Sequence, residues 1–226
     1  ADKLALLREI RRTGIEPSYG KPTMFHVRDN LLLVMMNHEY GINATDSAAV
    51  TEATIRARGE LHQIVRGLRK LGGAWDGVQI IASPEQIGIR DGRRIRGRFV
   101  VTKEDVVLGA RHEDAVVRPT FPVDIHAMTA EGNKTAPYGG RGVRVKPYDI
   151  PLRALIANDV DGLMMAGRCI SGDFIAHASY RVTGNSVAMG EAAGVTAAVA
   201  AKHHAAPHQV PWSEVQPVIA EVRTHG

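Results

Sequence analysis

The sequence predicts an α/β protein, because helical and strand-like hydrophobic patterns alternate along its 226 residues. After residue 45, apolar residues recur at a spacing of about 3.6 over a long segment, which is typical of an amphipathic helix. Short apolar runs bounded by Asp, Asn or Gly occur elsewhere and favour strands. Near the end of the chain, such a run and a glycine-containing loop precede a second long helical pattern.

The first 73 residues are predicted to form an amphipathic helix, a buried strand and a longer helix. The expected bounds are 3–12, 31–36 and 46–71. Thr45 or Asp46 supplies the capping side chain of the longer helix, and Gly72 ends it. At about 1.5 Å per residue, the longer helix spans roughly 39 Å, which is enough to line one side of a domain.

The next block is predicted to be rich in strands. The expected strands are 78–82, 86–89, 93–95 and 99–102. A three-residue turn at 90–92 separates apolar from charged side chains better than a two-residue turn. This hairpin leaves Arg93 on the apolar face, and a buried guanidinium needs an anionic partner. Arg93 is therefore expected to meet a substrate anion, a structural carboxylate or a cofactor, and Arg90 in the turn could do the same.

The remaining sequence predicts a helix start at Thr102–Asp105 and irregular strands with long connections over 116–151. A short buried strand at 163–166 is followed by a loop at 167–173. Two helices are then expected, at 185–203 and 213–222. This final part carries the strongest local signal for a functional site.

Composition excludes several classes of protein. Hydrophobic residues make up 44% and charged residues 23% of the chain, which disfavours disorder. The single cysteine, Cys169, excludes an intrachain disulfide framework, and no metal site is predicted. The apolar runs are too short for a membrane span, and a cytoplasmic location is expected by default. A net charge of +4 with only 5% aromatic residues gives little support to nucleic-acid binding.

The loop before residue 185 brings charged side chains to the start of a glycine- and alanine-rich helix. These side chains belong to Arg168, Asp173, His177 and Arg181. Backbone N–H groups at a helix start favour an anion or a polarised oxygen. A tightly packed core helix explains the same small residues, so spacing alone leaves both interpretations open.

Three stretches of sequence resemble one known family. Residues 161–171, 176–186 and 188–194 (DGLMMAGRCIS, AHASYRVTGNS and AMGEAAG) are similar to the C-terminal segment of FAD-dependent oxidoreductases related to fumarate reductase and the glucose-inhibited-division flavoproteins. Residues 87–106 and 148–155 resemble two earlier stretches of that family, in the same order. The resemblance covers roughly residues 78–200.

The resemblance implies an FAD-dependent oxidoreductase with a Rossmann-like FAD domain and an inserted substrate domain. Residues 1–145 then belong to the substrate-binding domain, and 146–226 form the C-terminal segment that completes the FAD domain. The positions implied to contact the cofactor are Gly167, Arg168, Gly172, Asp173, Arg181, Val182, Gly184, Asn185 and Ser186.

The resemblance also implies a partner. Members of the family begin with a G-x-G-x-x-G turn that holds the FAD pyrophosphate, and the 226 residues contain no such turn. Gly140 and Gly142 have the right spacing, but Val145 fills the third position. The N-terminal flavoprotein half is therefore expected on another polypeptide. A non-catalytic subunit that stabilises a flavoprotein partner is the alternative.

Two histidines are candidates for acid–base catalysis in such an enzyme. His177 is expected in the loop before the flavin helix, where a neutral imidazole accepts a proton while hydride passes from a small organic substrate to flavin N5. His126 is the second candidate. Tyr148 joins Arg90 and Arg93 as a residue expected to bind substrate. A packed histidine that only bonds its loop remains the alternative for His177.

Overall fold

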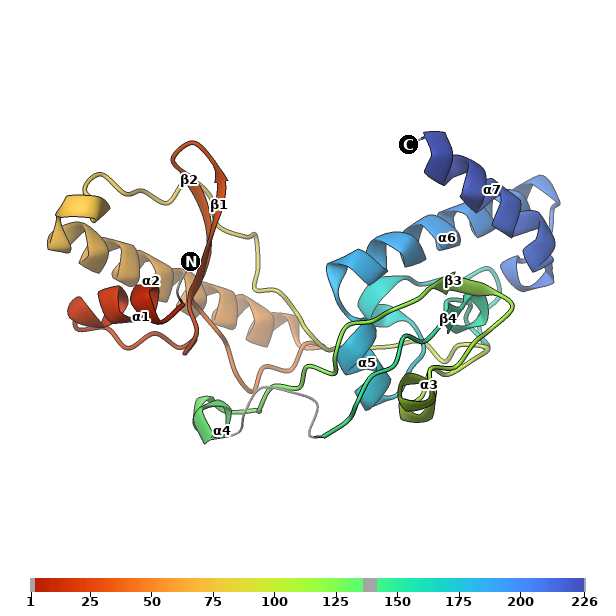
Figure 1. Cartoon of the computed structure of the whole chain (residues 1–226), viewed down its shortest axis with the longest axis horizontal. Helices are drawn as coiled ribbons and strands as arrows, with labels where there is room; N and C mark the ends of the chain where they lie inside the picture. The colour runs from red at the N-terminus through yellow and green to blue at the C-terminus, as the bar shows by residue number, and fades with distance from the viewer. Residues whose placement is uncertain (1–2, 136–141, 226) are drawn as a thin grey trace. The chain divides into compact units, whose positions relative to one another are not determined.

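A computed structural model describes residues 3–135 and 142–225, which form two compact units with an α/β fold (Figure 1). The first unit contains the chain up to Ile89 and a short segment from Ala127. The second contains Arg90–His126 and the C-terminal part of the chain. The assignment of 1–145 to a substrate domain and 146–226 to an FAD domain stays a prediction. Within the described residues, no helix is both long and apolar enough to traverse a bilayer.

The first unit is built on two helices and a hairpin. Its elements are α1 (Lys3–Arg12), β1 (Thr23–Arg28), β2 (Leu31–Met35), α2 (Ser47–Leu71), a 3₁₀ turn (Gly73–Trp75) and α4 (Ala130–Thr135). The Asp46 side chain accepts hydrogen bonds from the backbone N–H groups of Ala48 and Ala49, and Gly72 ends α2 with a φ of 67°. The predicted helices at 3–12 and 46–71 are confirmed, because their caps act locally.

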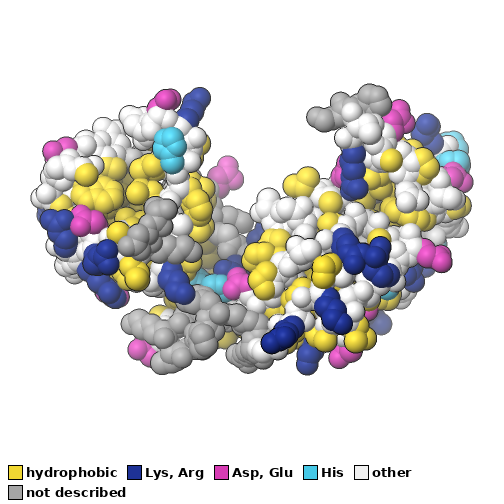
Figure 2. Space-filling view, viewed as in Figure 1, with side chains coloured by type: hydrophobic (Ala, Val, Ile, Leu, Met, Phe, Trp, Pro, Cys, Tyr) yellow, Lys and Arg dark blue, Asp and Glu magenta, His cyan; other side chains and the backbone are white. Residues whose placement is uncertain are grey.

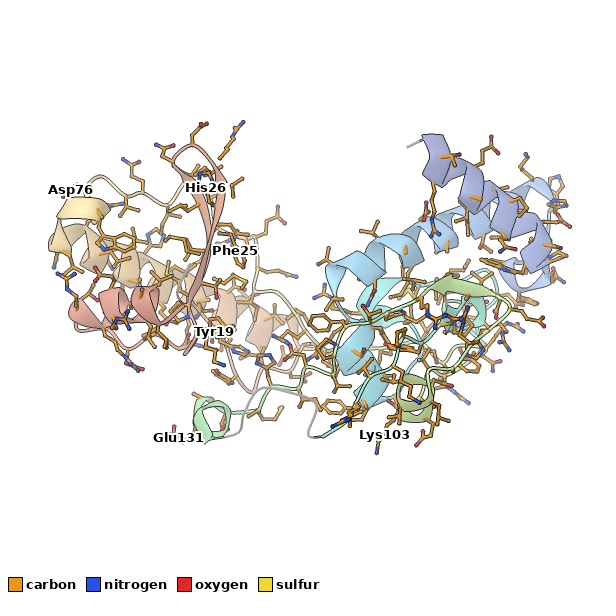
Figure 3. All side chains as sticks on the ribbon, viewed as in Figure 1. Tyr19, Phe25, His26, Asp76, Lys103 and Glu131 are labelled. Atoms are coloured by element: carbon orange, nitrogen blue, oxygen red, sulfur yellow. The ribbon has the colours of Figure 1, made fainter. Side chains whose placement is uncertain are left out.

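The expected strand at 31–36 forms, but the prediction that it is buried was wrong. β1 and β2 pair antiparallel as a two-stranded sheet, and Leu33 on β2 remains 58% exposed. Figure 3 labels Phe25 and His26 on β1, and Phe25 is also exposed. Hydrophobic side chains (yellow) are visible at the surface in Figure 2. The core of this unit lies instead between α1 and α2, around Ile10 and Ile64.

The second unit holds the larger core. Its helices are α3 (Lys103–Leu108), α5 (Phe174–Tyr180), α6 (Thr183–Lys202) and α7 (Trp212–His225), its strands are β3 (Ala115–Val117) and β4 (Ile150–Pro151), and its 3₁₀ turns are Leu152–Ala154, Gly167–Cys169 and Pro207–Gln209. The Thr102 and Asp105 side chains form the expected capping box of α3. β3 and β4 pair antiparallel, and Tyr148, Leu155 and Met189 are completely buried in this core.

The strand-rich block predicted at 78–102 was wrong. The four expected segments contain no regular strand, and the hairpin around 90–92 does not form. Instead, the backbone N–H of Ile95 donates to Cys169 O at 3.0 Å, and that of Arg98 donates to Ile156 O at 3.0 Å. The chain bonds to these distant segments rather than folding back on itself. As a result, Arg93 is exposed rather than buried.

The end of the chain also differs from expectation in two places. Residues 163–166 form no strand, because Met164 makes only an isolated bridge with Ile156. Residues 174–180, expected as a loop, form helix α5. The two final helices are confirmed, with α6 beginning at Thr183, two residues before the predicted start.

Gly97 lies where the extended segments of the second unit meet, and its replacement by Ala is expected to destabilise the protein. A Cβ atom at Gly97 would lie 2.6 Å from Ser171 Cβ and 3.0 Å from Ala154 O. Overpacking of this kind costs about 1–3 kcal/mol of unfolding free energy, which urea denaturation measures. Gly190→Ala in α6 is the control, since nothing lies within 4 Å of its Cβ position. It is expected to stabilise the chain by about 0.5–1 kcal/mol. Equal stability of Gly97→Ala and the wild type would contradict the packing described.

Candidate functional site

His177 is positioned by helix α5, which Asp173 caps. One Asp173 carboxylate oxygen accepts a hydrogen bond from the Ala176 N–H at 2.7 Å, and the other accepts one from the Lys103 N–H at 2.6 Å. Figure 3 labels Lys103 at the start of α3. Asp173 therefore joins α3 to α5. The expected loop position of His177 was wrong: a seven-residue helix carries it into the core, where it is fully buried.

The His177 ring lies among charged groups without a strong hydrogen bond of its own. Its Nδ1 is 3.8 Å from the Asp91 carboxylate, and its ring meets Tyr180 edge-on with centroids 5.4 Å apart. Neither ring nitrogen makes a hydrogen bond of good geometry within the described residues. Burial lowers the pKa of His177 to about 4, against the opposing effect of Asp91, with Arg94 and Arg181 adding to the decrease. His177 is therefore neutral near pH 7.

A second group of charges gathers around Asp124, and we call Arg90, Asp124, His126 and Arg181 the Asp124 cluster. The Asp124 carboxylate lies 2.7 Å from Arg90 Nη2 and 3.2 Å from His126 Nε2. Arg181 Nη2 donates to the backbone oxygen of Asp124 at 2.7 Å. The hydrogen bond from His126, aided by Arg90, lowers the pKa of Asp124 to about 2. Asp124 is thus a fixed negative charge that orients a histidine and an arginine.

Tyr148 is structural in its contacts. Its side chain is fully buried and its hydroxyl donates to Ser179 Oγ at 3.0 Å. Ser179 Oγ donates in turn to the backbone oxygen of Phe121 at 2.6 Å. Burial raises the pKa of Tyr148 to about 12. These contacts tie the segment before β4 to α5, and the substrate-binding role of Tyr148 stays a prediction.

The start of α6 gathers most of the positions that the resemblance assigns to the cofactor. Val182 is the N-cap, and its side chain makes no hydrogen bond to the N–H groups of the first turn. Gly184 is exposed, with nothing described within 4 Å of its Cβ position. Gly167 has a φ of 69° and packs against Ser186, whose Oγ would lie 3.0 Å from an added Cβ. The 167–169 turn thus lies against the helix start.

These features fit the polar edge of a flavin. Backbone N–H groups that lack a side-chain cap, together with the positive end of a 20-residue helix, favour an anionic or polarised oxygen. Gly184 has no side chain to block the approach of such an oxygen to the helix start. Asn185 and Ser186 do not obstruct it, because their side chains bond the backbone oxygens of Tyr180 and Val182.

A helix start whose N-cap side chain makes no hydrogen bond, in the same unit as a partly exposed cluster of His, Arg and Asp, is typical of a cofactor-dependent enzyme. The family model described as FAD dependent oxidoreductase matches residues 8–219. The chain belongs to this family, and FAD is its cofactor. Neither the curated proteins nor the solved structures gave a significant match.

The structure brings Arg90, His126 and Arg181 into one cluster and places His177 in the same unit. It does not bring Arg93 into the core. Sequence reasoning missed Asp91 and Asp124, as well as Arg94, whose Nη1 is 3.7 Å from the Asp91 carboxylate. Asp124 was detectable, since strand-like alternation puts it on the same side as His126 two residues later. Asp91 was not, because Asp-Gly is typical of a turn.

Proposed function

We propose that this chain is part of a dehydrogenase in which hydride passes from a small organic substrate to the flavin. Membership of the FAD dependent oxidoreductases supports the flavin chemistry. The open helix start of α6 supports the place of the cofactor, at Gly167 and Val182–Ser186, and the resemblance to fumarate reductase and the glucose-inhibited-division flavoproteins supports treating the segment as the end of an FAD domain. When bound, FAD supplies the hydride acceptor.

Of the two predicted catalytic histidines, we assign proton acceptance to His126. Its side chain is 12% exposed, although its Nδ1 atom is buried, whereas the whole His177 side chain is buried. Its Nε2 lies 3.2 Å from the Asp124 carboxylate, and the tautomer that donates this hydrogen bond has its lone pair on Nδ1. A carboxylate that orients a histidine in this way also stabilises the imidazolium once the proton has been accepted. This Asp–His pair is the observation that carries the proposal.

Arg90 and Arg181 have a supporting role in the same cluster. Arg90 neutralises Asp124, and Arg181 holds the Asp124 backbone. Burial, followed by the charge of Arg90, lowers the pKa of Arg181 without removing its charge. The two guanidinium groups provide positive charge beside the basic histidine, which suits a polar or anionic substrate. Arg168 and Gly172 remain proposed cofactor contacts.

We also propose that a second polypeptide carries the G-x-G-x-x-G half of the cofactor site. Native mass spectrometry of protein purified from its source tests this together with flavin binding. A complex heavier than the 24.4 kDa chain, containing a second polypeptide and one FAD, is expected. FAD on the 24.4 kDa chain alone would overturn the need for a partner. A third outcome is a complex that holds flavin which no substrate reduces under anaerobic conditions. That result would favour the alternative, in which the chain is a non-catalytic subunit that stabilises a flavoprotein partner.

A further inference from the structure

A separate pocket of about 360 Å³ opens in the second unit, beside the extended segment around Gly97. Arg94, Arg96, Asn158 and Ser171 contribute to its lining. None of these residues belongs to the Asp124 cluster or to the start of α6. Gly172 also lines the pocket, and it is the one lining residue that the function proposed above assigns to the cofactor.

Hydrogen bonds between distant segments hold the pocket wall. Gly97 bridges Ala157 antiparallel, and Val101 bridges Gly172 in parallel. The Asn158 N–H donates to Arg96 O at 2.8 Å. A Cβ on Gly172 would lie 2.7 Å from the Tyr180 ring, so the backbone is closely packed behind the wall. A wall built in this way is preformed, which reduces the cost of binding a ligand.

The lining carries positive charge and several hydrogen-bond donors. Arg94 is a quarter exposed, and its buried Nη1 has no hydrogen-bond partner among the described residues. The Asp91 carboxylate, at 3.7 Å, forms an ion pair with Nη1 but lies beyond hydrogen-bond distance. Arg96 and Asn158 are exposed, whereas Ser171 is almost fully buried. The described lining includes two guanidinium groups and no carboxylate.

We propose that this pocket binds the oxyanion group, carboxylate or phosphate, of a small molecule. A guanidinium presents parallel N–H donors that match such a group, and its buried Nη1 gains the partner that the protein alone does not provide. Asn158 and Ser171 carry side-chain donors for the remaining oxygens. The oxyanion site does not require the cofactor role proposed for Gly172, because the donors assigned to the oxyanion belong to Arg94, Asn158 and Ser171.

Titration of the whole chain with inorganic phosphate, and separately with acetate, tests the site by NMR. The backbone amide chemical shifts of Ser171 and Gly172 are expected to change saturably with at least one of the two anions. They are not expected to change in this way with chloride at equal ionic strength. Phosphate alone would identify a phosphate site, and acetate alone a carboxylate site. Saturation by neither anion would overturn the proposal. So would shifts confined to Gly67, in the basic pocket beside α2.

Charge-neutral variants assign the effect to the pocket. Arg94→Gln is expected to weaken binding about tenfold, the loss that follows from removing one charge-assisted hydrogen-bond pair. Arg96→Gln, at an exposed position, removes the same charge without disturbing the core and is also expected to weaken binding. Arg98→Gln is the matched control, because Arg98 is exposed and outside the lining. Equal weakening by Arg98→Gln would overturn the site, as would displacement of the anion by FAD.

Discussion

Replacement of His126 by Gln is expected to slow reduction of the bound flavin by substrate about 10²–10⁴-fold, the usual contribution of a general base. The Gln amide N–H reaches the position of His126 Nε2 and can still donate to the Asp124 carboxylate, which Nε2 bonds at 3.2 Å in the wild type. The cluster therefore keeps its hydrogen bond but loses the basic nitrogen. Anaerobic stopped-flow bleaching of the flavin in the assembled complex measures the rate, and flavin content is expected to be unchanged.

His203→Asn is the control for this experiment. His203 lies after α6, where its Nε2 is 2.9 Å from the Glu214 carboxylate, outside the Asp124 cluster. Its replacement is expected to leave the rate of flavin reduction unaltered. A His126→Gln complex that reduces its flavin at the wild-type rate would refute the assignment of His126. If His177→Asn alone produced the large decrease, the buried histidine would be the proton acceptor instead.

The second large effect concerns acid stability. The pKa of His177 is about 4 in the folded protein, below the usual value of 6.5. As the pH falls below about 6.5, the unfolded chain binds a proton at this position and the folded chain does not. The contribution of His177 to the free energy of unfolding is therefore fully present above about pH 6.5 and is lost progressively as the pH falls towards 4. The difference between the folded and unfolded pKa values corresponds to a loss of about 3 kcal/mol in the free energy of unfolding.

Urea unfolding of the wild type and of His177→Phe between pH 7 and pH 4 measures this loss. Phe cannot titrate, and it keeps an aromatic ring beside Tyr180 in place of nitrogens that lack strong hydrogen bonds. Its stability is therefore expected to fall less steeply with decreasing pH. His177→Asn offers the same comparison if the larger ring does not fit. Parallel curves for all three proteins would show that His177 titrates normally.

The helices were predictable because their signals are local. Asp46 and Gly72 lie next to the helix that they delimit, and the Thr102 capping box lies within four residues. The segment from Ile95 to Val101 was mispredicted because its partners lie about 60–75 residues away, at Ile156, Cys169 and Ser171. Alternation can propose a strand, but it cannot choose between a near partner and a distant one.

The candidate site shows the same difference between local features, which were predictable, and long-range contacts, which were not. His126 and Arg90 were selected from chemistry and pattern, and the structure joins them through Asp124. Helix α5 was missed because seven residues are too few to show a clear helical period. As a consequence, His177 was expected at an accessible place although it lies in the core. Chemically relevant residues can be identified from the sequence. How deeply each one is buried depends on packing between distant segments of the chain, which the sequence pattern does not reveal.

The exposed hairpin of β1 and β2 has a practical consequence for work on the isolated chain. Both strands have an outer edge without a partner strand in the described structure, and Val27, Leu33 and Met35 are about half exposed. Free edges with apolar side chains are templates for intermolecular strand addition and aggregation. The purified chain is therefore expected to self-associate as its concentration rises. A lysine at Leu33, in the middle of β2, is a direct way to keep the protein in solution for the titrations described above.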